Sequence, residues 1–362
     1  MKLWKFFLFI LALGVLFHSL AGLGVGTAFD SLLQSTMNGS ALVEGALLNQ
    51  SPLLMSASME SAPQPPYEAI PLSTETELSA KPETETAPPK DAFPDPPPPT
   101  TRRQADLPTL TLSGTPRQPN TAGVYVNNHT TYTINIPALL SELPSFIPAE
   151  NPTVLILHAH GTESFEPDGA DWYENINNYR TTDTNLNITR VGREIAAIFE
   201  ARGITVLHNQ YLHDYPSFRG SYERAFETAQ HYLAQHPDIQ IIFDIHRDAI
   251  LNPYGRYVRT MADIPGVEAS QVMLVIGTDH AGLYHPHWRE NFRFALHLQH
   301  AMVERYPTLA RPIDLREERF NAHLAPGAIL VEIGTCANTL QEALAASRLF
   351  AEVAADVMLG LG

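Results

Sequence analysis

Three short segments of this 362-residue sequence combine histidine with carboxylate side chains at close spacing, and each adjoins an apolar run. The first is His-Ala-His-Gly-Thr-Glu, from His158 to Glu163, and the second is Asp-Ile-His-Arg-Asp, from Asp244 to Asp248. The third has Glu332 inside the run Leu-Val-Glu-Ile. A hydrolytic zinc site needs about three nitrogen or oxygen ligands, one open position and a carboxylate that takes a proton from water. The three segments together can supply that chemistry.

The strongest candidates are His160, His246 and Glu332. Each also has a purely structural explanation, because a histidine at the end of a strand can simply be hydrogen-bonded. The metal-ligand interpretation is favoured for both histidines, since a buried strand rarely ends in His-Arg-Asp for solubility alone. Glu332 lies in a strand expected to be buried, where an acid requires a partner or a function. We therefore predict that His160 and His246 bind a metal and that Glu332 is functional.

Other residues near these segments leave alternatives open. Glu163 suits a third ligand as well as a helix cap or a surface position. Alternation along a strand points His158 in a different direction from His160. Arg247 and Asp248 are compatible with a simple ion pair. Four further histidines lie in polar loops, where we expect solvated side chains: His213, His280, His285 and His287.

Strands and helices that alternate along the chain must position these residues. Apolar runs predict strands at residues 154–157, 204–207, 239–245, 271–276 and 328–333. Helical periodicity predicts helices at residues 187–202, 221–235, 288–306 and 339–359. We expect an α/β fold, a mainly parallel sheet flanked by helices on both faces. In such sheets, sites lie past the carboxyl ends of the strands, so the three segments should meet at one edge. Before them, alternation at residues 124–126 and 132–136 predicts a short hairpin.

The N-terminal end of the chain predicts export. An uncharged, mostly apolar run covers residues 6–29, and a membrane-spanning helix needs about 20 such residues. Lys2 and Lys5 before the run and Asp30 after it favour a cytoplasmic N-terminus with the remaining chain exported. A cleaved signal peptide is the alternative, because Ser-Leu-Ala at residues 19–21 resembles a cleavage site. Both interpretations place the bulk of the chain outside the cytoplasm.

A second segment, residues 30–120, is predicted to be an extended and disordered linker. Fourteen of the 29 prolines lie between Pro52 and Pro108, among many Thr, Ser and Glu residues. Proline removes backbone donors and like charges repel, so such a stretch stays solvated. The chain is thus divided into an anchor or signal segment at residues 1–29, this linker, and a catalytic domain at residues 121–362.

The formal net charge of −16 and the single cysteine, Cys336, exclude further classes of protein. The acidic balance argues against a nucleic-acid-binding protein, which would normally present a basic surface. One cysteine rules out both a disulfide framework and a cysteine-rich zinc cluster. Any metal must therefore be held by histidine and carboxylate side chains.

Four segments resemble those of a known family. They cover residues 158–165, 213–222, 244–249 and 330–338, and the overall resemblance extends from Val124 to the C-terminus. The family is that of stage II sporulation protein P, which is related to the zinc-dependent N-acetylmuramoyl-L-alanine amidases. Its members are membrane-anchored peptidoglycan hydrolases that cut stem peptide from glycan during engulfment of the forespore. The predicted anchor and linker agree with this resemblance.

The resemblance implies a role for individual residues. His160 and His246 match the zinc histidines of the amidases, and Glu332 matches their catalytic glutamate. The middle ligand of that class is a glutamate at the start of the first helix, and residues 184–187 offer none. Glu163 is its natural substitute in this sequence.

The same resemblance implies a mechanism. Zinc polarises the scissile amide carbonyl and lowers the pKa of water, while Glu332 takes the water proton and returns it to the leaving amine. Arg247 steadies either the developing oxyanion or the ligand geometry, and the sequence leaves both open. The implied partners are peptidoglycan, the membrane through the N-terminal helix, and other membrane-bound cell-wall remodelling proteins. The implied location is the cell membrane, as a single-pass protein with its catalytic domain outside the cytoplasm.

Two other classes of function remain open. One is a catalytically inactive cell-wall-binding scaffold of the same fold, which the intact His160, His246 and Glu332 disfavour. The other is a serine hydrolase, disfavoured because the sequence lacks a Gly-x-Ser-x-Gly motif. The resemblance leaves open whether cleavage within the stem peptide accompanies amidase cleavage. It also leaves open whether the setting is engulfment during sporulation or related cell-wall remodelling.

Overall fold

The computed structural model describes four parts of the chain, residues 109–110, 123–147, 153–175 and 178–361. All of them belong to one compact unit, Pro98–Gly362. The predicted anchor at residues 1–29 lies outside the described residues, as does most of the predicted linker at residues 30–120. Within the described ranges, no helix combines the length and the apolar character needed to span a bilayer.

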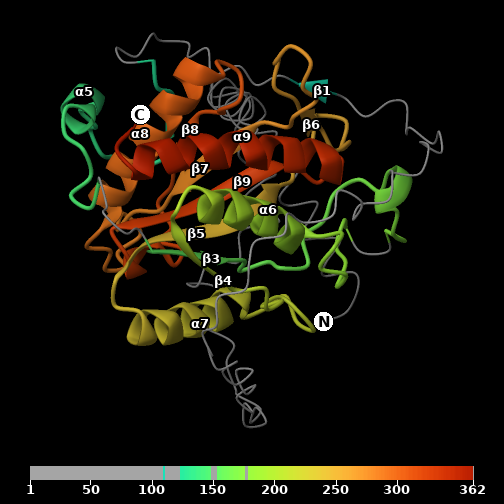
Figure 1. Ribbon diagram of the computed structural model, residues 1–362, viewed down its shortest axis with the longest axis horizontal. Coiled ribbons are helices and arrows are strands. Elements are labelled where there is room, and N and C mark those ends of the chain that lie inside the picture. Colours follow the sequence, from blue (N-terminus) through green and yellow to red (C-terminus); the bar gives the residue numbers. More distant parts are fainter. Residues whose placement is uncertain (1–108, 111–122, 148–152, 176–177, 362) are drawn as a thin grey trace, which may run out of the picture. The chain divides into compact units, whose positions relative to one another are not determined.

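A seven-stranded sheet forms the centre of the described residues (Figure 1). Its strands, in chain order, are β2 (Val126–Asn128), β3 (Thr153–Leu157), β4 (Thr205–His208), β5 (Ile239–Asp248), β7 (Val272–Ile276), β8 (Ile313–Leu315) and β9 (Gly327–Thr335). Across the sheet the order is β2-β8-β7-β9-β5-β3-β4. All neighbouring strands are parallel except β7 and β9, which are antiparallel. The expected α/β fold with a mainly parallel sheet is confirmed.

The helices follow the predicted pattern closely. They are α5 (Ile136–Leu140), α6 (Ile188–Ala201), α7 (Ser221–Gln235), α8 (Trp288–Arg305) and α9 (Leu340–Met358), with short 3₁₀ turns η1 (Gly169–Asp171) and η2 (Ala322–Leu324). The ends of α6 and α9 are set by local hydrogen bonds. The Asn187 side chain accepts from the N–H of Thr189, and Thr339 forms a capping box with Glu342. Such caps satisfy backbone donors that have no partner within a helix.

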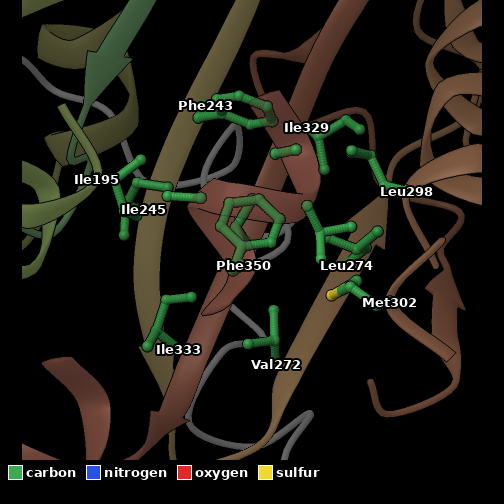
Figure 2. Close-up of a cluster of buried hydrophobic side chains, with 14 of the residues drawn as sticks. Ile195, Phe243, Ile245, Val272, Leu274, Leu298, Met302, Ile329, Ile333 and Phe350 are labelled. Atoms are coloured by element: carbon green, nitrogen blue, oxygen red, sulfur yellow. The ribbon is translucent and has the colours of Figure 1, made fainter. Parts of the chain in front are cut away.

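The main core lies between the sheet and the helices α6, α8 and α9. Alternate residues of a strand face opposite sides of a sheet, and Ile241, Phe243 and Ile245 of β5 all belong to this core. Phe350 of α9 is completely buried and lies at the centre of the layer in Figure 2. Its ring meets that of Phe243 edge-on, with the centroids 5.8 Å apart. The apolar residues of the predicted strands and helices therefore meet in this buried layer.

The opposite face of the sheet is covered less completely. Helix α7, which lies apart from the other helices in Figure 1, packs its Ala225 and Ala229 against the alternate residues of β3 and β5. Over β7 and β9 the face carries only a small apolar cluster, Met273, Val275 and Leu330, with Phe320 packed against it. Polar side chains of β5 and β9 that point to this face are therefore not sealed beneath a helix layer.

The predicted hairpin at residues 124–126 and 132–136 is wrong. β2 pairs instead with β8 in parallel, and Ile136 begins α5, whose N-terminus is capped by the side chain of Asn135. A three-residue strand gains too little from a local partner, so its pairing is decided by a strand far away in the chain. A further short strand, β1 (Thr109–Leu110), lies within the predicted linker and pairs with β6 (Arg259–Thr260).

Replacing Phe350 should measure how much this core contributes. We expect Phe350→Ala to lower the free energy of unfolding by roughly 3–5 kcal/mol, because it removes a large buried side chain and leaves a cavity. Tyr254→Ala is the control, since Tyr254 is 89% exposed and its loss should change stability by less than about 0.5 kcal/mol. Urea unfolding of both variants gives the comparison. Equal stabilities would contradict the assigned core.

Candidate metal and catalytic site

The pairing of β5 with β9 brings two of the predicted residues together. His246 lies opposite Glu332 in the register of these parallel strands. Asp244, two residues before His246, points to the same face of the sheet because strand side chains alternate. These side chains lie within the last residues of the strands, since β5 continues to Asp248 and β9 to Thr335. The strands are thus longer than predicted, and the site is on a sheet face close to its edge.

His246 is held between two carboxylates. Its Nε2 lies 2.9 Å from Oδ1 of Asp244, and its Nδ1 lies 3.2 Å from Oε2 of Glu163. Asp244 Oδ1 is itself fixed by accepting the N–H of Ala159 at 2.8 Å. Burial alone would lower the pKa of His246, but the charges and hydrogen bonds of Asp244 and Glu163 raise it well above 6.5. A positive charge is therefore favoured at this imidazole.

Glu163 lies in the loop between β3 and α6 and is surrounded by cationic groups. Its Oε1 is 3.4 Å from Nη2 of Arg180 and 3.6 Å from Nη1 of Arg247. Its Oε2 accepts the backbone N–H of Arg247 at 3.3 Å. Burial would raise the pKa of Glu163, but Arg247, His246 and Arg180 outweigh it and lower that pKa. Of the alternatives open from sequence, the structure therefore brings Glu163 to the site as a buried carboxylate.

The Arg247 side chain joins two parts of the segment between β3 and α6. Its Nε donates to the carbonyl oxygen of Ser164 at 2.8 Å. Its Nη2 donates to the carbonyl oxygens of Asn178 at 3.3 Å and Tyr179 at 3.1 Å. The side chain is buried, at 5% exposure. Of the two roles that the sequence left open, this geometry favours support of the ligand arrangement over contact with an oxyanion.

His160 lies in the loop after β3 and brings its ring next to that of His246. Its ring lies edge-on to that of His246, with the centroids 5.2 Å apart, and stacks on Phe218 at 4.5 Å. Ser221 Oγ is 3.2 Å from its Nδ1. Burial lowers the pKa of His160 to about 3, so the imidazole is neutral at neutral pH. A neutral imidazole is the form of histidine that binds metals.

His158 lies outside this group, as strand alternation indicates. Its Nδ1 is 2.9 Å from the carbonyl oxygen of Ile245, and its Nε2 is 2.9 Å from Nε2 of His208. The side chain is completely buried, and burial lowers its pKa to about 4. Both ring nitrogens of His158 are used to join β3, β4 and β5.

Glu332 retains an unsatisfied carboxylate oxygen. Its Oε2 is buried without a hydrogen-bond partner among the described residues. Burial, followed by the nearby charge of Asp248, raises the pKa of Glu332 well above 4.5. Asp248 itself accepts from Nη1 of Arg311 at 2.6 Å, so the ion pair expected at this position forms with Arg311 and not with Arg247. A carboxyl group with a raised pKa and a free oxygen is suited to proton transfer.

Sequence reasoning assigned no role to Asp244, Tyr222 or Arg180, which complete the site. Asp244 could have been found from its spacing, because a residue two positions from His246 in a strand shares its face. The ring of Tyr222 lies parallel to His246 at 6.3 Å and edge-on to His160 at 5.2 Å. Burial, followed by the charges of Asp244, Glu332 and Glu163, holds the pKa of Tyr222 well above 10. Nothing in its local sequence indicates these long-range contacts.

Two histidines expected to be solvated are buried instead. His213 accepts or donates at both nitrogens, with its Nδ1 2.7 Å from the carbonyl oxygen of His158 and its Nε2 2.9 Å from Oγ1 of Thr228. His285 is 2% exposed, and burial lowers its pKa to about 3. Polar loop composition failed as a guide here because both side chains pack against distant parts of the chain, His213 against His158 and His285 beside His323.

The donor set fits a zinc ion in its chemistry. Among the residues that the structure describes, no three His, Cys, Asp or Glu side chains converge closely enough to hold a metal as they stand. The 3.2 Å between His246 Nδ1 and Glu163 Oε2 is nevertheless close to the roughly 3.3 Å between two ligand atoms of one tetrahedral zinc. Asp244 on the outer nitrogen of His246 is the usual support of a metal-binding histidine. His160, neutral and adjacent, is the natural third donor.

Comparison with known proteins identifies relatives of the chain. The family model described as stage II sporulation protein P matches residues 55–355. Stage II sporulation protein P of Bacillus subtilis (strain 168) is 25% identical over an alignment of 233 residues, which covers 59% of this chain and 53% of that protein. The chain therefore spans about half the length of this curated relative.

Solved structures with limited similarity include three N-acetylmuramoyl-L-alanine amidases. AmiC2 of Nostoc punctiforme has a TM-score of 0.31 and 15% identity, over 58% of this chain and 96% of that one. The amidase from Clostridium difficile 630 has a TM-score of 0.32 and 14% identity, over 57% and 95%. Ami1 from Mycobacterium smegmatis has a TM-score of 0.33 and 14% identity, over 59% and 97%.

Removing Arg180 should destabilise the loop that holds the site. Arg180 pairs with Asp214 through Nη1, and the Asp214 carboxylate is completely buried. We expect Arg180→Ala to cost about 3 kcal/mol of unfolding free energy, because a buried charge loses its partner. Arg190→Ala is the matched control, since its i,i+4 helix pair with Glu194 is only partly buried, with the two side chains 36% and 19% exposed, and is worth roughly 0.3–0.5 kcal/mol. Urea unfolding curves compare them, and similar losses would contradict the buried-pair interpretation.

Proposed function

Because the chain belongs to the stage II sporulation protein P family, we propose that it is a peptidoglycan hydrolase. The membership confirms the family predicted from the sequence motifs. The specific activity proposed is that of a zinc-dependent N-acetylmuramoyl-L-alanine amidase, which cuts the stem peptide from the glycan strand. One observation carries the proposal: His246 is fixed between Asp244 and Glu163 and lies opposite Glu332 in the adjacent strand.

His160, His246 and Glu163 would hold the zinc ion. Asp244 would accept the outer N–H of His246, which orients the ring and strengthens it as a ligand. When bound, zinc supplies a Lewis acid that polarises the amide carbonyl and lowers the pKa of water. Metal binding would displace the proton between His246 and Glu163. The affinity for the metal should therefore weaken as the pH falls.

Glu332 is assigned as general base and general acid. Its unpaired Oε2 would accept a proton from the attacking water and return it to the nitrogen of the leaving peptide. Burial raises the pKa of Glu332, and a raised pKa makes its carboxylate a stronger base toward the water proton. Arg247 would hold Glu163 in place through its guanidinium and its backbone N–H, and it would not touch the substrate.

Recognition of the substrate would rest on the surface around the site. The net charge of −16 provides no general attraction to an anionic cell wall. Phe218 stacks on His160 and is 42% exposed, so it can contact a bound substrate. Phe320 packs against the apolar cluster of Met273, Val275 and Leu330. Met273 lies opposite Glu332 in the neighbouring strand, so this cluster places apolar side chains beside Glu332.

The proposal includes a setting for the reaction. Peptidoglycan lies outside the cytoplasmic membrane, and the predicted anchor at residues 1–29 with its linker at residues 30–120 would hold the catalytic domain there. Sporulation engulfment is the process that the family name suggests. Other membrane-bound cell-wall remodelling proteins are the expected partners. An analysis of the full chain by membrane fractionation, with residues 1–29 deleted as control, tests this part of the proposal.

The zinc ligands can be tested by metal analysis. Purified protein should contain about one zinc, and His160→Ala and His246→Ala should each lose most of it. His158→Ala serves as the control, because both nitrogens of His158 already bond within the protein and zinc content should be retained. Circular dichroism would confirm that all three variants are folded. Full zinc content in both ligand variants would refute the proposed metal site.

The role of Glu332 can be separated from metal binding. Glu332→Gln keeps the volume but cannot accept a proton, so cleavage should fall roughly 10²–10⁴-fold with zinc content unchanged. Digestion of purified peptidoglycan, with fragments identified by mass, measures the rate and the bond cut. Glu318→Gln is the control, because Glu318 is 42% exposed and should cleave normally.

Other outcomes would identify other functions. Loss of zinc from Glu332→Gln would make Glu332 a ligand and remove Glu163 from the metal site. Near-normal cleavage by that variant would refute the assigned base. Binding of peptidoglycan by the unaltered protein without release of any fragment would instead support the inactive scaffold.

A further inference from the structure

The first turn of α7 places Tyr222 over the candidate site. The ring contacts two imidazoles, lying parallel to His246 and edge-on to His160. On its other side it meets the ring of Phe320, with the centroids 6.1 Å apart. The backbone carbonyl of Tyr222 accepts from Nδ2 of Asn321 at 2.9 Å, which fixes this turn against the neighbouring segment. The ring is therefore held in position by contacts that do not involve its hydroxyl group.

Most polar groups of the site are already paired with each other. His246 bonds with Asp244 and Glu163, and Nδ1 of His160 lies within reach of Ser221. Among the described residues, Oε2 of Glu332 is buried without a hydrogen-bond partner, and the hydroxyl of Tyr222 also has none. The carboxylates of Asp244, Glu332 and Glu163 all act on this hydroxyl electrostatically. One proton-accepting group and one hydrogen-bond donor are thus left free within the same site.

Ring packing alone does not account for a tyrosine here. A phenylalanine would make the same contacts with His246, His160 and Phe320 without placing an unpaired hydroxyl among carboxylates. In the described residues this hydroxyl is not one of the buried side-chain atoms without a partner, so it remains accessible from the site. An accessible donor beside a reacting centre can bind the oxygen on which negative charge develops.

We infer that the Tyr222 hydroxyl donates a hydrogen bond to the carbonyl oxygen of the scissile amide and stabilises the negative charge that develops there. The inference rests on the proposed amidase function. As the water oxygen bonds to the carbonyl carbon, the C=O electron pair moves to that oxygen and the water proton moves to Glu332. The electron pair on that oxygen then re-forms the C=O bond as the C–N bond breaks, the C–N electron pair remains on nitrogen, and Glu332 returns the proton to that nitrogen. Tyr222 keeps its own proton throughout, because it acts only as a donor.

The inference is tested by Tyr222→Phe, which removes the hydroxyl and keeps the ring contacts. A donor to a developing oxyanion typically contributes about 10²–10³-fold to kcat, so a decrease of that size is expected. KM should change little, since the hydrogen bond strengthens mainly in the transition state. Tyr232→Phe is the matched control. Tyr232 lies on the same helix and packs against the apolar cluster that contains Ala225 and Ala229, so this substitution should leave kcat unchanged.

Two measurements besides activity distinguish this role from a structural one. Zinc content of Tyr222→Phe should equal that of the unaltered protein. In the Glu332→Gln background, where cleavage should be too slow to disturb a binding measurement, addition of Tyr222→Phe should alter the affinity for a soluble muropeptide by less than about threefold. Loss of zinc, or a loss of affinity as large as the loss of kcat, would overturn the inference.

The result also separates this inference from the function on which it rests. Cleavage by the unaltered protein together with normal kcat for Tyr222→Phe would overturn the role of Tyr222 alone. Absence of cleavage by the unaltered protein would overturn the amidase function and this inference with it. Cleavage that falls in Tyr222→Phe but not in Tyr232→Phe, with zinc and affinity retained, would support it.

Discussion

The hydrogen-bonded row of Asp244, His246 and Glu163 is the interaction on which the site depends. It places an imidazole between two carboxylates in a region with almost no solvent exposure, where an unpaired charge would be very unfavourable. Each charged group in the row is stable in this buried position only because the other two are present. Removal of one would leave a buried charge uncompensated. The guanidinium groups of Arg247 and Arg180 balance the remaining negative charge. The geometry is thus fixed by electrostatic necessity, and the same arrangement presents nitrogen and oxygen donors to a cation.

The sheet allows such a row because its two faces are covered differently. Helices α6, α8 and α9 bury one face in a continuous apolar core, with Phe350 at its centre. The other face carries α7 over β3 and β5 but only a small apolar cluster over β7 and β9. Alternation along β5 and β9 sends His246 and Glu332 to this second face. The side chains proposed for catalysis would therefore be anchored in rigid, well-paired strands and could still meet a substrate.

Buried groups outside the site hold the loops that complete it. His213 and His158 are linked through the carbonyl oxygen of His158, and His158 also bonds to the carbonyl oxygen of Ile245 in β5. These bonds fix the backbone from which His160 and Glu163 project. The loop of Tyr179 is tied to Ser164 by the Arg247 guanidinium. The positions of the proposed ligands are thus supported by neighbours that satisfy backbone groups, and a metal site would need such rigid support.

The sequence by itself determined the α/β class, the main strands and helices, and the three segments that carry His160, His246 and Glu332. Those features arise from local periodicity and from residue types whose chemistry is independent of context. It could not supply the partner of β2, the length of β5, or the burial of His213 and His285, because short strands and polar loops are placed by distant parts of the chain. Only the tertiary structure brought Asp244, Arg180 and Tyr222 to the same site. The physical reason is that electrostatic pairing and ring contact depend on distance in space, and residues separated by tens of positions carry no local pattern that records it.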